Sequence, residues 1–138
     1  MTRRCPQSKF VGLGILQGWK WIINNRGYAN VVRSPKDLVY GLVYEISPSD
    51  EASLDRSEGV PWAYTKESME IELQRAEGGE KVAVQSLVYI DKRRVEEGEP
   101  LEEYVHRMNM GINDAVKKGL PEWYIKKYMR GSIPAGGG

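Results

Sequence analysis

The first third of the chain alternates short apolar runs with turn-forming residues, a pattern typical of β-strands. An apolar run covers residues 10–16, and alternate positions over residues 19–23 are aromatic or aliphatic. The Asn-Asn-Arg-Gly segment at residues 24–27 has the composition of a tight turn. We therefore expect a hairpin that continues into a strand over residues 28–33, within a meander or barrel rather than a helical bundle.

Three further strands are predicted, together with the turns that join them. The Ser-Pro-Lys-Asp segment at residues 34–37 predicts a turn, and the apolar run at residues 38–46 follows it. Because both faces of that run are apolar, we expect it to be a central strand. Residues 69–73 alternate between apolar and polar side chains, which predicts one solvated face. Residues 82–90 lie beyond the Gly78-Gly79 turn and predict a buried strand.

Three segments carry helix signals. Ser47 is suited to cap a helix, Pro48 suits its first position, and Gly59 ends it about three turns later. Apolar residues recur at helical spacing over residues 100–119, and Pro121 opens a final helix. The chain is therefore expected to be an α+β protein whose helices cover the strands.

Composition and charge narrow the class of protein. The chain has 138 residues, with 41% hydrophobic and 28% charged, which suits one packed domain over residues 1–131 with a flexible Pro/Gly tail at residues 132–138. Its net charge is +1 with acids and bases interleaved, so we expect neither nucleic-acid nor membrane binding. The only cysteine, Cys5, fits a reducing, cytoplasmic setting, and His106 has no other ligand types at metal spacing, so no metal site is expected.

One motif points to a family. The Leu-Asp-Arg-Ser-Glu-Gly-Val segment at residues 54–60 resembles the Leu-Asp-x-x-Glu-Gly-Val signature of the gamma-glutamylcyclotransferases, and Tyr64 follows at about the family's spacing. The Val-Tyr-Gly-Leu-Val-Tyr segment at residues 39–44 is similar to the family strand that precedes this signature by one helix. Further similarity lies at residues 27–30, 86–89, 111–115 and 119–124, so the resemblance covers most of the chain.

The resemblance implies a fold, a reaction and a substrate. The fold is a small closed or nearly closed mixed β barrel flanked by helices. In the reaction, the α-amine of a γ-glutamyl group attacks its own γ-carbonyl and releases 5-oxoproline together with an amine or amino acid. The substrate is a small γ-glutamyl molecule, and no cofactor or metal is needed.

Glu58 is the expected catalytic residue, because the signature places the family's proton-transfer glutamate there. The sequence adds reasons for a raised pKa of Glu58. The residue lies at the negative end of a helix dipole, Asp55 is a like charge one turn back, and Leu54 shares its helix face. Without the signature, a surface glutamate before a glycine stop would be the more common interpretation.

Three residues are expected to bind the substrate, since the resemblance places two tyrosines in the family's glutamyl pocket and an asparagine at a position that lines the family's barrel. They are Tyr89, Tyr64 and Asn30. Core packing is the alternative for both tyrosines, although a buried phenol needs a polar partner, which favours the pocket for Tyr89. Asn30 ranks last because asparagine also serves turns and strand ends.

The family opens with a strand and a Tyr-Gly-Ser-Asn-Leu loop that the printed chain does not contain, and residues 1–6 resemble the segment just after that loop. We therefore expect a domain that is N-terminally truncated relative to the family and a poor catalyst as printed. The alternative function is a non-catalytic barrel that binds a glutamyl-like metabolite or a protein partner. Under this alternative, the missing strand exposes a sheet edge, which favours a homodimer.

Overall fold

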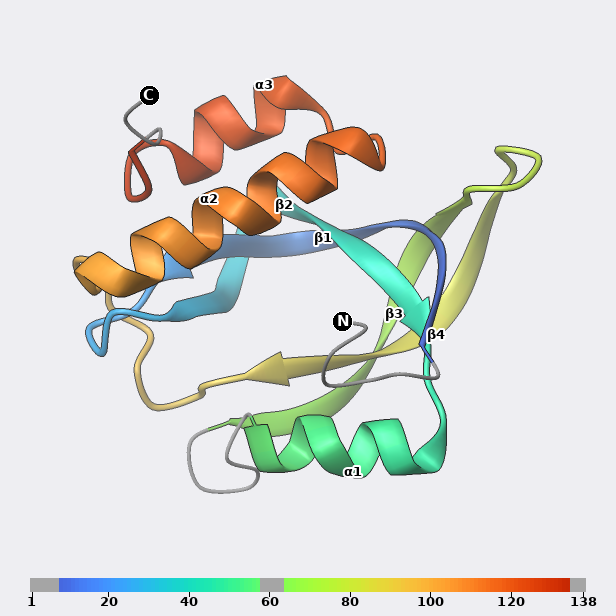
Figure 1. Cartoon of the computed structure of the whole chain (residues 1–138), viewed down its shortest axis with the longest axis horizontal. Helices are drawn as coiled ribbons and strands as arrows, with labels where there is room; N and C mark the ends of the chain where they lie inside the picture. The colour runs from blue at the N-terminus through green and yellow to red at the C-terminus, as the bar shows by residue number, and fades with distance from the viewer. Residues whose placement is uncertain (1–7, 58–63, 135–138) are drawn as a thin grey trace. The chain divides into compact units, whose positions relative to one another are not determined.

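The computed structural model describes residues 8–57 and 64–134 and has the α+β composition expected from the sequence (Figure 1). Its elements are, in chain order, β1 (Lys9–Ile23), β2 (Ala29–Glu45), α1 (Pro48–Ser57), β3 (Thr65–Arg75), β4 (Lys81–Ile90), α2 (Glu102–Lys117), α3 (Glu122–Tyr124) and the π-helical turn η1 (Ile125–Met129). Among the described residues, no helix is both long enough and apolar enough to cross a membrane.

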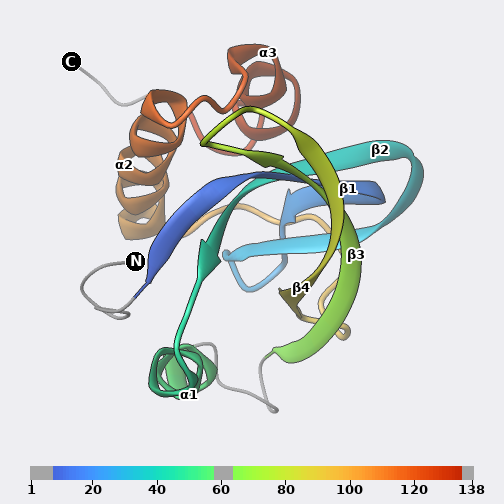
Figure 2. The ribbon, with the colours of Figure 1, turned by 90° about the vertical axis from the view of Figure 1, so that its right-hand side faces the viewer.

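The four strands form an antiparallel sheet in the order β2-β1-β3-β4. The register of β1 with β3 runs from Gly12 opposite Arg75 to Ile15 opposite Glu72. β3 and β4 pair along almost their full length and run side by side as a curved ribbon in both views (Figures 1 and 2). The sheet is thus antiparallel where a mixed one was expected, and closure into a barrel stays a prediction.

The chain divides into two compact units, and each is described by itself. The first unit consists of residues 1–16 and 41–92, and the second consists of residues 17–40 and 93–138. β1 and β2 each contribute residues to both units. A single domain over residues 1–131 remains a prediction from the sequence.

The first unit is built around the pairing of β1, β3 and β4. Ile71 and Leu73 are buried, while their neighbour Glu72 is only half-buried, which matches the alternation predicted for this strand. Gly12 allows β1 to approach β3, because a Cβ atom at this position would lie 2.1 Å from the carbonyl oxygen of Gln74. The glycines near the start of β1 therefore serve strand packing.

The second unit contains the confirmed turn between β1 and β2. The side-chain oxygen of Asn24 accepts hydrogen bonds from the backbone N–H groups of Arg26 and Tyr28, at 3.0 Å and 3.3 Å. Gly27 has a φ of 92°, a conformation that suits glycine. Helix α2 confirms the helix predicted from the periodicity of residues 100–119, and it lies beside α3 in both views (Figures 1 and 2).

Three predictions for the strands and their turns are wrong. The segment at residues 34–37 is not a turn but lies inside β2, and β2 lies at one end of the described strand order rather than at its centre. Among the described strands β2 has only β1 as a neighbour, so an N–H on its other side need not pair and Pro35 is tolerated there. β4 lies at the opposite end of that order and is not buried along its length: Leu87, for example, is 42% exposed.

The packed part of the chain extends past residue 131. Ile133 is fully buried, and its backbone N–H donates to the carbonyl oxygen of Met129 at 2.7 Å. The carbonyl oxygen of Pro134 accepts a hydrogen bond from the side chain of Asn109. Residues 132–134 are therefore tied to the second unit, and the rest of the predicted tail lies outside the described residues.

Candidate active site

Helix α1 begins with a reciprocal cap, as the sequence indicates. The hydroxyl oxygen of Ser47 accepts from the backbone N–H of Asp50 at 3.1 Å, and the Asp50 carboxylate accepts from the backbone N–H of Ser47 at 3.4 Å. This arrangement satisfies two backbone donors that the first turn of a helix leaves unpaired. The cap fixes the start of the helix that carries the Leu-Asp half of the family signature. The predicted stop at Gly59 lies outside the described residues.

A polar cluster joins α1 to the β3–β4 pair. The Asp55 carboxylate accepts a hydrogen bond from the phenol of Tyr89 at 2.8 Å and another from the ammonium of Lys66 at 2.9 Å. Lys66 also donates to Glu51, which lies one turn before Asp55 on the same helix. We call Glu51, Asp55, Lys66 and Tyr89 the Asp55 cluster. Its bonds hold the Tyr89 hydroxyl against α1.

The charges of this cluster reinforce one another. Hydrogen bonds from Lys66 and then from Tyr89 hold the pKa of Asp55 below its ordinary value of 3.8. Hydrogen bonds to Glu51 and Asp55 raise the pKa of Lys66 above its ordinary value of 10.5. Both groups are therefore ionised at neutral pH, and the Tyr89 phenol proton points to a carboxylate.

A cleft of about 620 Å³ lies within the first unit beside this cluster. Most of its lining comes from residues 42–45 at the end of β2 and residue 46 just after it, from Leu54 of α1, and from residues 84–87 and Tyr89 of β4. This volume lies within the usual range for small-molecule sites. The lining is largely apolar and includes a few polar groups, a composition that such sites share.

The predicted site residues lie in different parts of the structure. Glu58 lies outside the described residues and follows Ser57, the last residue of α1, in the sequence. Tyr89 lines the cleft of the first unit. Tyr64 is half-buried just before β3 and is not among the described residues that line the cleft. Asn30 belongs to the second unit, where its buried amide donates to the carbonyl oxygen of Arg94 at 3.1 Å.

Sequence reasoning missed Lys66 and Glu51. Asp55 entered only as a like charge acting on Glu58, whereas the structure pairs it with a cation. The spacing of Glu51 and Asp55, four positions apart on one helix, was the available signal for a shared cationic partner. Lys66 could not be assigned to that pair, because nothing local in the sequence says which face of β3 meets α1. Over residues 8–57 and 64–134, no group of three His, Cys, Asp or Glu side chains could hold a metal ion.

The fold and the cleft define a small α+β protein with a ligand-sized site beside a helix that carries the family signature. A model of the family described as "Gamma-glutamyl cyclotransferase, AIG2-like" matches residues 2–106, so the chain belongs to this family. No curated protein matches the chain.

Solved structures agree with this assignment. An uncharacterized protein, loc79017, from Homo sapiens is 26% identical with a TM-score of 0.72, over 98% of this chain and 80% of the other. A structure named "Gamma-glutamyl cyclotransferase" is 25% identical with a TM-score of 0.73, over the same shares of the two chains. An AIG2-like protein from Mus musculus, at 19% identity and a TM-score of 0.55 over 66% of this chain and 63% of its own, supports the fold alone.

Proposed function

We propose that this protein is a gamma-glutamylcyclotransferase that releases 5-oxoproline from small γ-glutamyl compounds. The observation that carries the proposal is the 2.8 Å hydrogen bond from Tyr89 to Asp55, which ties the family signature to the wall of the cleft. Leu54, the first residue of the signature, is buried and also lines the cleft. The proposal includes closure of the sheet into a barrel, with Glu58 facing the substrate.

The reaction is an intramolecular acyl transfer. The free α-amine of the glutamyl group attacks the γ-carbonyl carbon, and a new C–N bond closes a five-membered ring. The bond from that carbon to the departing nitrogen then breaks, so one proton leaves the attacking nitrogen and one reaches the leaving nitrogen. Because the attacking group is already tethered, folding the glutamyl chain into attack geometry can supply an effective molarity of roughly 10⁵ M or more.

Glu58 is assigned both proton transfers. As a carboxylate it accepts the proton of the attacking nitrogen, and as a carboxylic acid it returns a proton to the leaving nitrogen. The pairing of Asp55 with Lys66 offsets the charge of Asp55, so that charge is a smaller influence on Glu58 than the sequence suggested. The helix end and burial in a substrate-filled site remain as reasons for a raised pKa of Glu58.

Tyr89 is assigned to the α-ammonium group of the substrate, which loses one proton to solvent before the free amine attacks. Its phenol proton is directed to Asp55, so toward the cleft its oxygen acts as a hydrogen-bond acceptor. An acceptor backed by an ionised carboxylate favours a cationic group. This arrangement would select γ-glutamyl compounds whose α-amine is free.

The test is release of 5-oxoproline, followed by chromatography, from a γ-glutamyl amino acid and a γ-glutamylamine. The chain is assayed as printed and also extended by a strand and loop of the family's Tyr-Gly-Ser-Asn-Leu type. Such a loop is expected to add substrate positioning and backbone donors worth about 10²–10³ in rate. The proposal predicts turnover that is much faster in the extended form. If neither form turns over, while both bind a glutamyl ligand, the proposal is wrong and a binding role replaces it.

A further inference from the structure

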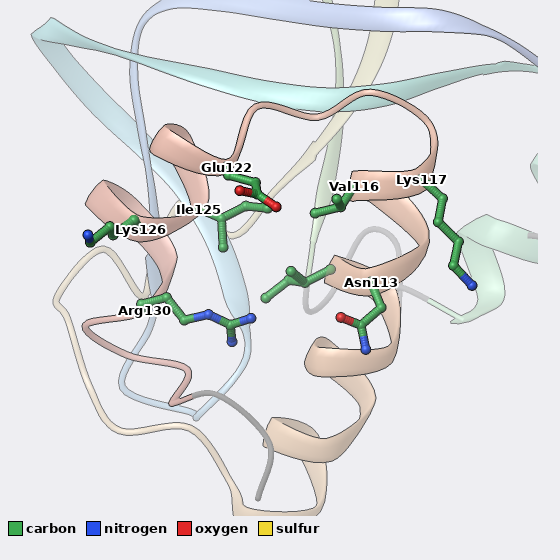
Figure 3. Close-up of a pocket in the computed structure, with 8 residues that line it drawn as sticks. Asn113, Val116, Lys117, Glu122, Ile125, Lys126 and Arg130 are labelled. Atoms are coloured by element: carbon green, nitrogen blue, oxygen red, sulfur yellow. The ribbon is translucent and has the colours of Figure 1, made fainter. Parts of the chain in front are cut away.

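The second unit contains a cleft of about 610 Å³ between α2 and the helical segment formed by α3 and η1 (Figure 3). Its apolar part is formed by Ile112 and Val116 of α2 and by Ile125 of η1. Ile112 and Ile125 are almost fully buried. We call Ile112, Val116 and Ile125 the apolar floor of the cleft.

A fixed cation lies in this cleft. Nη1 of Arg130 donates to the side-chain oxygen of Asn109 at 2.6 Å and to the carbonyl oxygen of Ile133 at 3.3 Å. Both acceptors are neutral, and no carboxylate in the described part of the chain forms an ion pair with Arg130. Both bonds use Nη1, so Nε and Nη2 keep the pair of parallel donors that a carboxylate prefers. Figure 3 shows the guanidinium group pointing into the cleft.

An anion lies in the same cleft. The carboxylate of Glu122, from the first turn of α3, is exposed and is turned toward the cleft in Figure 3. Within residues 64–134 it forms no ion pair with Arg130, so the two charges are more than 4.0 Å apart. They are eight positions apart in the sequence, which is at most about 12 Å along a helix.

We infer that this cleft binds a short peptide of two or three residues with free termini and an apolar side chain. The peptide ammonium is bound by Glu122, the peptide carboxylate by Arg130, and the apolar side chain by the floor. Two or three extended residues span roughly 7–10 Å, which fits the separation of the two charges once their side chains reach inward. Lys117 and Lys126 also line the cleft and add positive potential that favours the carboxylate.

Arg130 also has a structural role, because it links η1 to Asn109 and to the chain at Ile133. That role accounts for Nη1 but not for Glu122 across the cleft, which forms no ion pair with any residue that the structure describes. A ligand with both charges satisfies both side chains, whereas a simple anion satisfies only one and is repelled by the other. The inference concerns the second unit and does not rest on the cyclotransferase proposal.

The test is a titration of the full chain, labelled with ¹⁵N, with the peptide Ala-Leu-Ala, followed by amide chemical shifts. We expect saturable shifts confined to residues 109–133, with a Kd of roughly 0.1–1 mM for so small a ligand. N-acetyl-Ala-Leu-Ala and Ala-Leu-Ala-amide each lose one charge and should bind at least about fivefold more weakly. Gly-Gly-Gly, which lacks the apolar side chain, should also bind more weakly. Equal binding of the capped and free peptides, or no saturable binding, would overturn the inference.

Two variants test which side chain binds which charged end of the peptide. Glu122→Gln should weaken Ala-Leu-Ala at least about fivefold but leave N-acetyl-Ala-Leu-Ala unchanged, because the acetylated peptide has no ammonium to lose. Arg130→Lys should weaken Ala-Leu-Ala but not its amide, since lysine keeps the charge and lacks the paired donors. The control is Glu103→Gln, an exposed first-turn glutamate of α2 outside the cleft, which should bind like the unmodified chain. If Arg130→Lys fails to fold, Glu122→Gln alone decides: an unchanged affinity for Ala-Leu-Ala refutes the site.

Discussion

Replacement of Tyr89 by phenylalanine tests the wall of the proposed active site. The change removes one oxygen atom, which donates to Asp55 at 2.8 Å and is proposed to accept from the substrate ammonium. A hydrogen bond to a charged group contributes about 1.5–3 kcal/mol, and the half-buried position of Tyr89 reduces this to about 1–2 kcal/mol. The expected loss is therefore about five- to thirtyfold in kcat/KM for a γ-glutamyl substrate.

Stability should change much less than activity. Asp55 keeps its bond to Lys66 in the variant and remains partly exposed to water, so no buried charge is left unpaired. The assay compares kcat/KM for 5-oxoproline release with the unfolding midpoint in urea. Tyr28→Phe is the matched control, because Tyr28 is also half-buried but belongs to the second unit. Full kcat/KM in Tyr89→Phe, with an unchanged midpoint, would refute the assignment of Tyr89 to the substrate.

Three stability predictions test the packing. Because bonding lowers the pKa of Asp55, the stability it adds is present above its ordinary pKa of 3.8 and is lost as the pH falls through the lower pKa of the folded protein. The free energy of unfolding in urea should therefore differ between the natural chain and Asp55→Asn by a constant amount from pH 5 to 8, and this difference should shrink below about pH 3.8. A difference that grows on acidification would contradict the pairing of Asp55. Ile133→Ala should lower the free energy of unfolding by about 2–5 kcal/mol, since Ile133 is fully buried, and a change under 1 kcal/mol would argue against a packed chain end. Gly12→Ala should cost about 1–3 kcal/mol because its Cβ meets the Gln74 carbonyl oxygen at 2.1 Å, and an unchanged urea midpoint would place that carbonyl elsewhere.

Local patterns predicted well where the helices and the β3–β4 pair lie in the chain, although not the exposure of β4. Their periodicity and end signals lie within each segment, as with the Ser47 cap of α1 and the alternation around Ile71. The order of strands in a sheet is a long-range property, and two apolar faces did not reveal that β2 lies at one end of the described strand order. The segment at residues 34–37 was predicted to be a turn because of Pro35. Whether a strand can contain this proline depends on the strand order, which the local sequence does not show.

The candidate site was predictable only in part. The signature and the pocket role of Tyr89 come from resemblance, and the cleft fits that role without testing it. The contact between Asp55 and Lys66 joins α1 to β3, two elements that are not continuous in the chain, so their spacing in the sequence does not fix it. For Asn30, the sequence left a structural role open as the alternative to substrate binding. Its buried amide donates to the carbonyl oxygen of Arg94, which is such a structural role.

The central claim is that Glu58 transfers the protons of a cyclotransferase reaction, and Glu58→Gln tests it most directly. Glutamine keeps the size and hydrogen bonding of the side chain but cannot accept the proton, and general acid–base catalysis typically contributes 10²–10⁴ in rate. The measurement is kcat for 5-oxoproline release in the extended form, with binding of a glutamyl ligand followed separately. Glu77→Gln, in the exposed turn between β3 and β4, is the control. The account predicts that kcat falls at least about a hundredfold in Glu58→Gln while ligand binding survives. Turnover equal to that of Glu77→Gln would remove Glu58 from its assigned role.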